Sequence, residues 1–188
     1  MQHFQLNSSL RILLATNSLI LLAGAMLAPI YALFVEDIGG SLMDASIAGG
    51  IFALFAGVTT FISGKISDSF KENELIIVLG YVIVGIGFLS YLWANSIVAL
   101  FIIQALIGIG EAIYSPAFDA VYSKHLDTKS AGTQWGAWES MNYFTSAIGA
   151  IVGGSIVTIF GFNTLFICMF ALCITSGLYI YHLKRSVL

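Results

Sequence analysis

The sequence predicts an all-α membrane protein with six transmembrane helices. Of the 188 residues, 59% are hydrophobic and only 9% are charged, whereas a soluble domain carries about 25% charged residues. The hydrophobic residues form six runs of about 20 residues or more, enough to cross a bilayer. These runs cover approximately residues 10–35, 45–67, 75–93, 97–122, 133–160 and 162–183. We therefore expect a single six-helix transmembrane domain over residues 1–188.

The distribution of basic residues predicts the orientation of these helices. All seven Lys and Arg residues lie near the two chain ends or near the connections after the second and fourth runs. They are Arg11, Lys65, Lys71, Lys124, Lys129, Lys184 and Arg185. Because short cytoplasmic loops are rich in Lys and Arg, we expect a multi-pass protein of the cell (plasma or inner) membrane with both termini cytoplasmic.

The first run also has the order of a signal peptide, since Arg11 precedes a long apolar stretch that reaches Val35. The core of a signal peptide has about 7 to 15 residues, and this stretch is longer. We therefore interpret it as a retained transmembrane helix. Asn17 lies inside this helix and Pro29 lies near its outer end.

The second run has small residues along one face, at spacings of three and four. They are Gly50, Ala53, Gly57, Thr60 and Gly64. Small residues let transmembrane helices approach closely, so we expect a packing seam here. The third and sixth runs are almost entirely apolar and suit the lipid-facing periphery. Cys168 and Cys173 in the sixth run are expected to be ordinary thiols.

The fourth run carries a polar stripe of residues three or four positions apart, so that they share one face of a helix. Its members are Gln104, Gly108, Glu111, Ser115 and Asp119. Glu111 falls near the middle of the span, where an ionised carboxylate is energetically costly. Its side chain must therefore face a polar cavity, pair with a donor or hold a proton. We expect Pro116 to bend this helix just below Glu111.

The fifth run has the same spacing, with Glu139, Asn142 and Ser146 followed by Gly149 and Gly153. Polar helices thus occupy the first and fourth positions, and helices with small-residue seams occupy the second and fifth. Apolar helices occupy the third and sixth. This order repeats after three helices, as expected for two inverted three-helix repeats.

We expect polar residues of these spans to line a cavity in the middle of the membrane. The candidates are Asn17, Gln104, Glu111, Tyr114, Ser115, Glu139 and Asn142. Glu111 is the candidate proton- or cation-responsive group, because the nearest basic residues lie at the ends of the spans. The alternative is a permanently protonated Glu111 that is hydrogen-bonded to a neighbouring helix. Glu139 could equally be an interfacial acid.

Three short motifs lie on or beside these helices. They are Gly64-Lys-Ile-Ser-Asp68, Gln104-Ala-Leu-Ile-Gly108-Ile-Gly110 and Gly149-Ala-Ile-Val-Gly153-Gly154. Together they resemble motifs of the major facilitator superfamily, and the whole chain resembles one six-helix half of such a transporter, most like the N-terminal half. Ser69, Gln104 and Ala150 depart from the basic residue, the Arg and the Pro of the family patterns.

The resemblance implies a secondary transporter that works by alternating access, and not an enzyme. It also implies that Gly64 and Asp68 help to latch a gate on the cytoplasmic side. We add Asp119 to this gate because it lies close to the same interface. Asp68 could otherwise be an ordinary loop carboxylate, and Asp119 a solvated or salt-bridged charge.

Chains of this family usually contain twelve helices in two halves, so the resemblance implies a partner half. A second copy in the same orientation would supply it. We therefore expect a parallel homodimer, in which Gly50 and Gly57 of one copy face Gly149 and Gly153 of the other. The alternatives are a different partner half, or seams that pack inside the chain.

The expected ligand is a small organic molecule that is neutral or cationic and partly apolar, because the candidate cavity residues include acids and aromatics but no Lys or Arg. This favours efflux, with proton antiport as the expected coupling. The alternative function is a non-transporting membrane subunit, or a half-transporter that is inactive without its partner half. The sequence contains no phosphate loop, Cys/His metal spacing or nucleophile motif. We therefore expect no catalytic residues, cofactor, metal or nucleic-acid partner, and membrane lipid as the surroundings.

Overall fold

The computed structural model describes residues 6–183 and is helical over nearly all of them. Six helical spans in this range are long and apolar enough to cross a membrane. The chain is therefore a multi-pass all-α membrane protein, as predicted. The predicted limits of the spans differ from the observed limits by only a few residues.

The first span is broken near its C-terminal end. It consists of α1 (Ser8–Leu27), the 3-10 helix η1 (Ala28–Ile30) and α2 (Tyr31–Asp37). Pro29 lies in η1, and it interrupts the α-helix because proline has no main-chain N–H to donate. At the other end, the Asn7 side chain caps α1 by accepting a 2.8 Å hydrogen bond from the Leu10 N–H.

The other five spans are nearly regular helices. They are α3 (Leu42–Ser69), α4 (Asn73–Ser90) with its 3-10 extension η2 (Tyr91–Trp93), α5 (Ile97–Lys124), α6 (Ala131–Phe160) and α7 (Phe162–His182). Ser41 and Asp44 form a capping box at the start of α3. Gly161 alone separates α6 from α7, and its φ of +80° lies in the left-handed region that glycine adopts readily.

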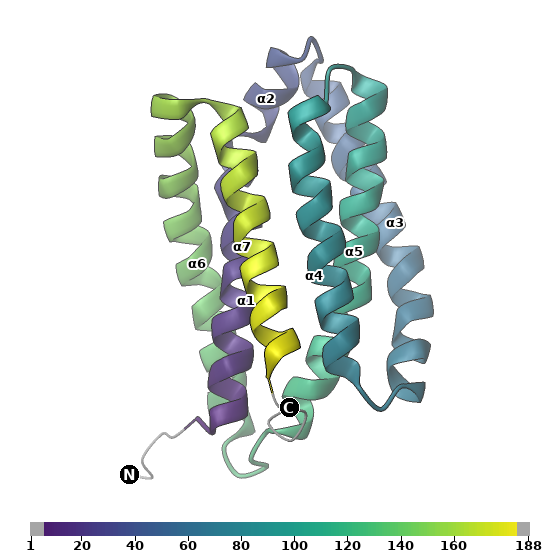
Figure 1. The fold of residues 1–188 in the computed structure, drawn as a ribbon, viewed down its shortest axis with the longest axis vertical. Coiled ribbons are helices and arrows are strands. Elements are labelled where there is room, and N and C mark those ends of the chain that lie inside the picture. The colour runs from purple at the N-terminus through teal and green to yellow at the C-terminus, as the bar shows by residue number, and fades with distance from the viewer. Residues whose placement is uncertain (1–5, 184–188) are drawn as a thin grey trace.

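The helices pack in the spatial order α6, α1, α7, α4, α5, α3 (Figure 1). The contact between α4 and α7 joins one group of three helices (α1, α6, α7) to another (α3, α4, α5). In the first group α1 lies between α6 and α7, and in the second α5 lies between α3 and α4. The first span corresponds to the fourth, the second to the fifth and the third to the sixth. When each span is exchanged for its counterpart, one group becomes the other. The packing therefore matches two inverted three-helix repeats.

The basic residues gather at one end of the bundle, which we call the basic end. Figure 1 shows the start of α1, the α3–α4 connection, the α5–α6 connection and the end of α7 together there. The described basic residues lie on or next to these segments: Arg11, Lys65, Lys71, Lys124 and Lys129. Lys184 and Arg185 lie outside the described residues. The assignment of the basic end to the cytoplasm remains a prediction from this pattern.

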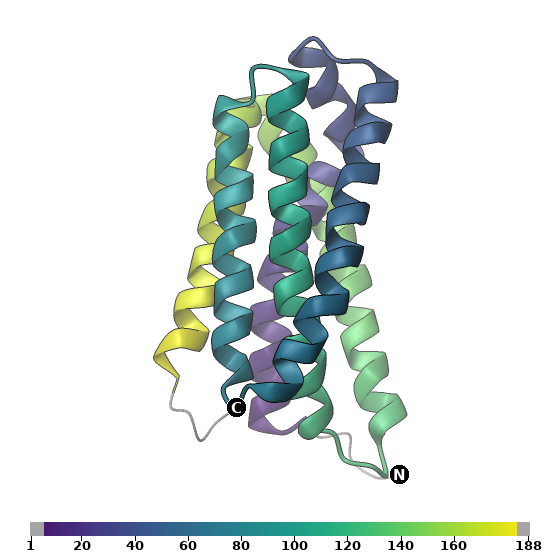
Figure 2. The ribbon, with the colours of Figure 1, turned by 90° about the vertical axis from the view of Figure 1, so that its right-hand side faces the viewer.

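Glycines allow α5 to approach both of its neighbours, between which it lies in Figure 2. A Cβ added to Gly108 of α5 would lie 2.5 Å from the Phe52 carbonyl oxygen of α3. A Cβ added to Gly80 of α4 would lie 2.7 Å from the Gly110 carbonyl oxygen of α5. Larger side chains do not fit at these distances, so the Gly-x-Gly motif holds α5 tightly against α3 and α4.

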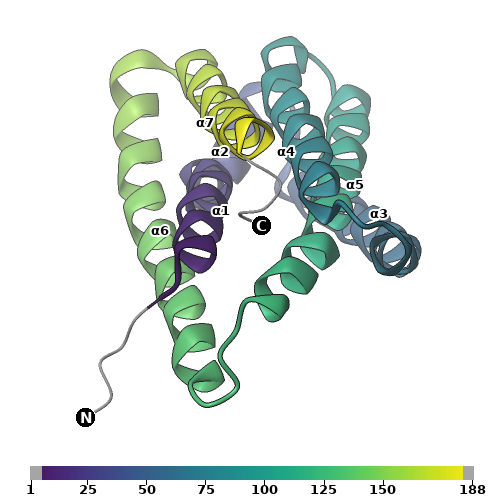
Figure 3. The same ribbon diagram turned by 60° about the horizontal axis from the view of Figure 1, so that its bottom comes forward.

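Pro116 lies inside α5. Figure 3 shows that the last turns of this helix are inclined relative to its earlier part. A proline within a helix is a usual cause of such a bend, so the expected bend below Glu111 is present.

Candidate functional site

Two adjoining hollows meet at Glu111, between α1 and α5. The hollow farther from the basic end, which we call the distal hollow, has a volume of about 330 Å³. The second, which we call the central hollow, has a volume of about 220 Å³. Glu111, Gly24 and Phe88 border both hollows. The Glu111 side chain is exposed in the isolated chain, so it faces open space rather than the interior of the bundle.

Gln104 closes one side of the distal hollow and is itself tied to two tyrosines. Its side-chain amide donates hydrogen bonds to the Tyr31 hydroxyl at 2.7 Å and to the Tyr91 hydroxyl at 3.1 Å. Tyr31 belongs to α2 and Tyr91 to η2, so this one amide joins three separate elements. Both N–H groups of the amide are thereby used, which satisfies a buried polar group.

A second pair of tyrosines lies beside the central hollow. The Tyr114 ring packs edge-on against the Tyr81 ring, with the centroids 4.9 Å apart. The Tyr81 hydroxyl donates a hydrogen bond of 3.2 Å to the Asn17 side-chain oxygen. Asn17 is buried, so in this conformation it holds Tyr81 instead of lining either hollow.

Glu111 is the one charged residue among the described residues that line the two hollows. It makes no hydrogen bond or ion pair with another described residue, whereas the described basic residues lie at the basic end. The surrounding walls are mainly apolar and aromatic, with Gln104, Asn142, Ser146 and tyrosine hydroxyls as polar groups. A carboxyl group in such a place can exchange a proton or attract a cation.

The basic end is held together by polar and aromatic contacts. The Asn7 side chain donates a 2.8 Å hydrogen bond to the His125 carbonyl oxygen, which ties the start of α1 to the end of α5. The Tyr122 hydroxyl donates to the Gln134 carbonyl oxygen at 2.6 Å. The Tyr122 and Trp135 rings lie 4.9 Å apart. These contacts fix the α5–α6 connection across the end of the bundle.

A family model described as Major Facilitator Superfamily matches residues 13–187 of the chain. The chain belongs to this superfamily. The six-span packing, with two groups of three helices, agrees with one half of the superfamily fold. The resemblance inferred from the three sequence motifs is confirmed.

Several curated members of the superfamily are similar in sequence. The bacillibactin exporter of Bacillus subtilis (strain 168) is 27% identical over 120 residues, which cover 62% of this chain and 30% of the exporter. The multidrug resistance protein MdtG of Salmonella schwarzengrund (strain CVM19633) is 22% identical over 178 residues, 90% of this chain and 41% of MdtG. The uncharacterized MFS-type transporter YitZ of Bacillus subtilis (strain 168) is 23% identical over 156 residues, 83% of this chain and 94% of YitZ. The chain thus spans less than half the length of the first two relatives.

The structure brings together part of the predicted cavity set. Gln104 and Glu111 line the distal hollow, and Glu111, Tyr114 and Asn142 line the central hollow. The other predicted members, Asn17, Ser115 and Glu139, line neither hollow. Ser115 is half-buried on α5, and Glu139 is exposed on α6.

Sequence reasoning missed the tyrosines that hold the site: Tyr31, Tyr81 and Tyr91. Tyrosine is usual at membrane interfaces, and Tyr91 fits that expectation by position. Tyr81 offered a signal, because its hydroxyl falls well inside an otherwise apolar span. The hydrogen bond between Gln104 and Tyr31 could not be predicted from local sequence, because the two residues are 73 positions apart.

The residues assigned to the gate lie on two helices of the superfamily half. Asp68 is exposed near the end of α3, and Asp119 is exposed on the same side of α5 as Glu111. Gly64 is half-buried, with open space where a Cβ would lie. Their role in a gate remains a prediction.

The two predicted seams have different surroundings. A Cβ at Gly50 or Gly57 of α3 would have no other atom within 4 Å. A Cβ at Gly149 of α6 would lie 2.7 Å from the Ala25 Cβ of α1, and one at Gly153 would overlap the Met26 main chain. Gly149 and Gly153 therefore pack inside the chain and do not face a second copy, which agrees with the alternative of seams that pack within one chain. The α3 glycines face outward.

Proposed function

We propose that this chain is one half of a secondary efflux transporter that works by alternating access, with Glu111 as its proton-responsive group. The observation that carries the proposal is the position of Glu111. It stands in the middle of α5, exposed to two hollows between α1 and α5, and it is the one charged residue among their described lining residues. A lone intramembrane acid at such a site is a candidate for ion coupling.

The lining favours small organic molecules that are neutral or cationic and partly apolar. Phe52, Phe88 and Tyr91 offer aromatic surface in the distal hollow, and Glu111 offers a negative charge when ionised. Aromatic faces and a carboxylate together suit organic cations. The names of two relatives, a multidrug resistance protein and an exporter, support efflux as the direction.

The transport pathway in this proposal needs a second six-helix half, and a second copy of the chain in the same orientation is our candidate. The exposed faces of α3 and α6 support this. Of the residues in the most apolar, membrane-length stretch of each helix, only 6% in α3 and 11% in α6 are buried, against 33% to 44% in the other spans. Two helices at opposite edges of one chain are therefore left for contact with a partner or with lipid.

The test is transport by the purified chain in liposomes, with ethidium as a cationic, partly apolar probe. An acidic lumen should drive ethidium inward, because protons that leave through an antiporter exchange for substrate that enters. In the Glu111→Gln variant, which has nearly the same shape but no titratable group, gradient-driven accumulation should fall to the level of protein-free liposomes.

Glu139→Gln is the matched control, since it removes an exposed acid that lines neither hollow. It should retain most of the accumulation. Passive exchange of ethidium between the two sides should persist in Glu111→Gln, which shows that the variant is folded. Undiminished gradient-driven accumulation in Glu111→Gln would reject the coupling role, and a wild-type chain that moves no probe would favour a non-transporting subunit.

A further inference from the structure

A third hollow lies on the other side of α1 from Glu111, near the basic end. It has a volume of about 300 Å³ and runs between α1 and α7. Its walls include Arg11, Ile12, Ala15 and Leu19 of α1, and Thr175 and Tyr179 of α7. We call it the Arg11 groove.

Helix geometry shows that the Arg11 groove faces away from the candidate transport site. Successive residues of an α-helix are rotated by about 100°. Ile12, Ala15 and Leu19 therefore lie on the side of α1 opposite to Leu21 and Gly24, which line the central hollow. The groove accordingly opens on the outer wall of the six-helix unit, where lipid surrounds a transmembrane protein.

The polar part of the groove lies at the depth of lipid headgroups. Arg11 is in the first turn of α1, which begins at Ser8, and Tyr179 is in the last turn of α7, which ends at His182. Leu19 lies about 12 Å deeper along the helix than Arg11. The groove thus has a polar mouth at the membrane surface and an apolar floor that runs into the membrane.

The charge at the mouth favours an anion. Arg11 is exposed, and it is the one charged residue among the described lining residues. Its guanidinium makes no hydrogen bond or ion pair with another described residue, and the same holds for the hydroxyls of Ser8 and Tyr179. A guanidinium binds phosphate oxygens with two parallel hydrogen bonds.

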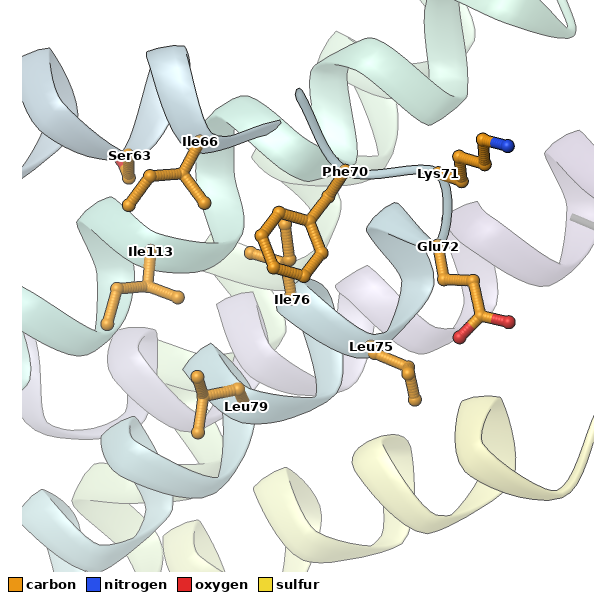
Figure 4. A pocket seen from close by; sticks show the side chains of 9 residues that line it. All are labelled: Ser63, Ile66, Phe70, Lys71, Glu72, Leu75, Ile76, Leu79 and Ile113. Atoms are coloured by element: carbon orange, nitrogen blue, oxygen red, sulfur yellow. The ribbon is translucent and has the colours of Figure 1, made fainter. Parts of the chain in front are cut away.

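A larger hollow at the same end provides a contrast. It has a volume of about 490 Å³ and lies between α3, α4 and α5. Figure 4 shows apolar side chains such as Phe70 around it, with Lys71 and Glu72 next to each other at one end. Because these two charges are opposite and adjacent, this hollow has no preference for an anion.

We propose that the Arg11 groove binds an anionic phospholipid. The lipid phosphate pairs with the Arg11 guanidinium, and one acyl chain lies along Ile12, Ala15 and Leu19. Such a lipid would attach α1 to the membrane surface at the basic end, on the side away from the candidate transport site.

The test is native mass spectrometry of the purified full chain with added phosphatidylglycerol or phosphatidylcholine of identical acyl chains. Phosphatidylglycerol should bind in preference, and Arg11→Gln should reduce its binding by about fivefold, the contribution of one basic residue near an anionic surface. Lys71→Gln is the matched control and should leave this binding unchanged.

A second variant tests the apolar floor. Ala15→Phe fills the groove on an exposed position of α1 and should reduce the binding of phosphatidylglycerol while Arg11 is intact. Glycerol phosphate, which lacks acyl chains, should not compete. Equal binding of both lipids to the wild-type chain, unchanged binding to Arg11→Gln, or competition by glycerol phosphate would overturn the proposal.

Discussion

The helices α3 and α6 occupy equivalent places in the two repeats, and both carry glycines at similar spacing. Their glycines nevertheless differ in what they contact. In α6, Gly149 and Gly153 bring the backbone of α1 into direct contact. In α3, Gly50 and Gly57 face open space, and the close approach is supplied instead by Gly108 of the neighbouring α5.

The difference shows what a small-residue spacing does and does not specify. The spacing marks a smooth helix face on which another backbone can lie closely. It does not say which helix will lie there, because either member of a pair can supply the glycines. Symmetry of the fold therefore does not require symmetry of the packing residues.

The largest expected effect is at Gly153. A Cβ there would lie 2.6 Å from the Met26 Cα and closer still to its carbonyl oxygen. Gly153→Ala should therefore separate α6 from α1 and lower the free energy of unfolding by about 3 kcal/mol, the upper part of the usual range for overpacking. The measurement is unfolding by sodium dodecyl sulfate in mixed micelles, with Gly154→Ala, which meets open space, as the control.

Gly108→Ala tests the α3 side of the comparison. The added methyl group would lie 2.5 Å from the Phe52 carbonyl oxygen and 3.2 Å from the Ala56 nitrogen. We expect a loss of about 2 kcal/mol, because α3 must move away from α5. If Gly108→Ala unfolds like the wild-type chain, the close packing of α3 on α5 is not what holds the helix in place.

The smallest effect on stability is expected at Gly57. Gly57→Leu should change the free energy of unfolding by no more than about 0.5 kcal/mol, because the side chain would enter open space. A larger loss in the same unfolding assay would mean that the α3 seam is covered within the chain.

The proposed dimer can be tested directly at the exposed face of α3 that carries Gly57. Gly57 of α3 and Ala147 of α6 are both exposed and both lie near the middle of their helices. Oxidation of membranes that contain a Gly57→Cys, Ala147→Cys variant should give a disulfide-linked dimer if α3 of one copy packs on α6 of the other. The variants that carry only Gly57→Cys or only Ala147→Cys, with Cys168 and Cys173 retained, measure the background of dimers cross-linked through other cysteine pairs. A double variant that gives no more cross-linked dimer than this background would contradict the arrangement.

The fold class and the six spans could be predicted from the sequence, because the length and polarity of each span are local properties. The places of α4 and α7 could not: these almost entirely apolar spans were expected at the lipid-facing periphery, but their contact joins the two groups of helices, and both are more buried than α3 and α6.

The three-and-four spacing indicated which residues of α5 share a helix face, but not which of them would be exposed: Gln104 and Gly108 of the polar stripe are buried, whereas Glu111 and Asp119 are exposed. The surroundings of the site could not be predicted in the same way. The hydrogen bonds of Gln104 to Tyr31 and of Asn17 to Tyr81 join residues on different elements, and no periodicity within one helix indicates such a pairing.

The break at Pro29 has a consequence for how the two repeats are fastened together. Up to Leu27 the first span packs with α6 and α7, but after η1 its last segment, α2, contacts α3 and is bonded through Tyr31 to Gln104. The polypeptide itself therefore crosses from one repeat to the other, as a strap over the end opposite the basic residues. The proline-containing 3-10 turn Ala28–Ile30 is therefore the junction between the part of the first span that packs in one repeat and the segment that contacts the other.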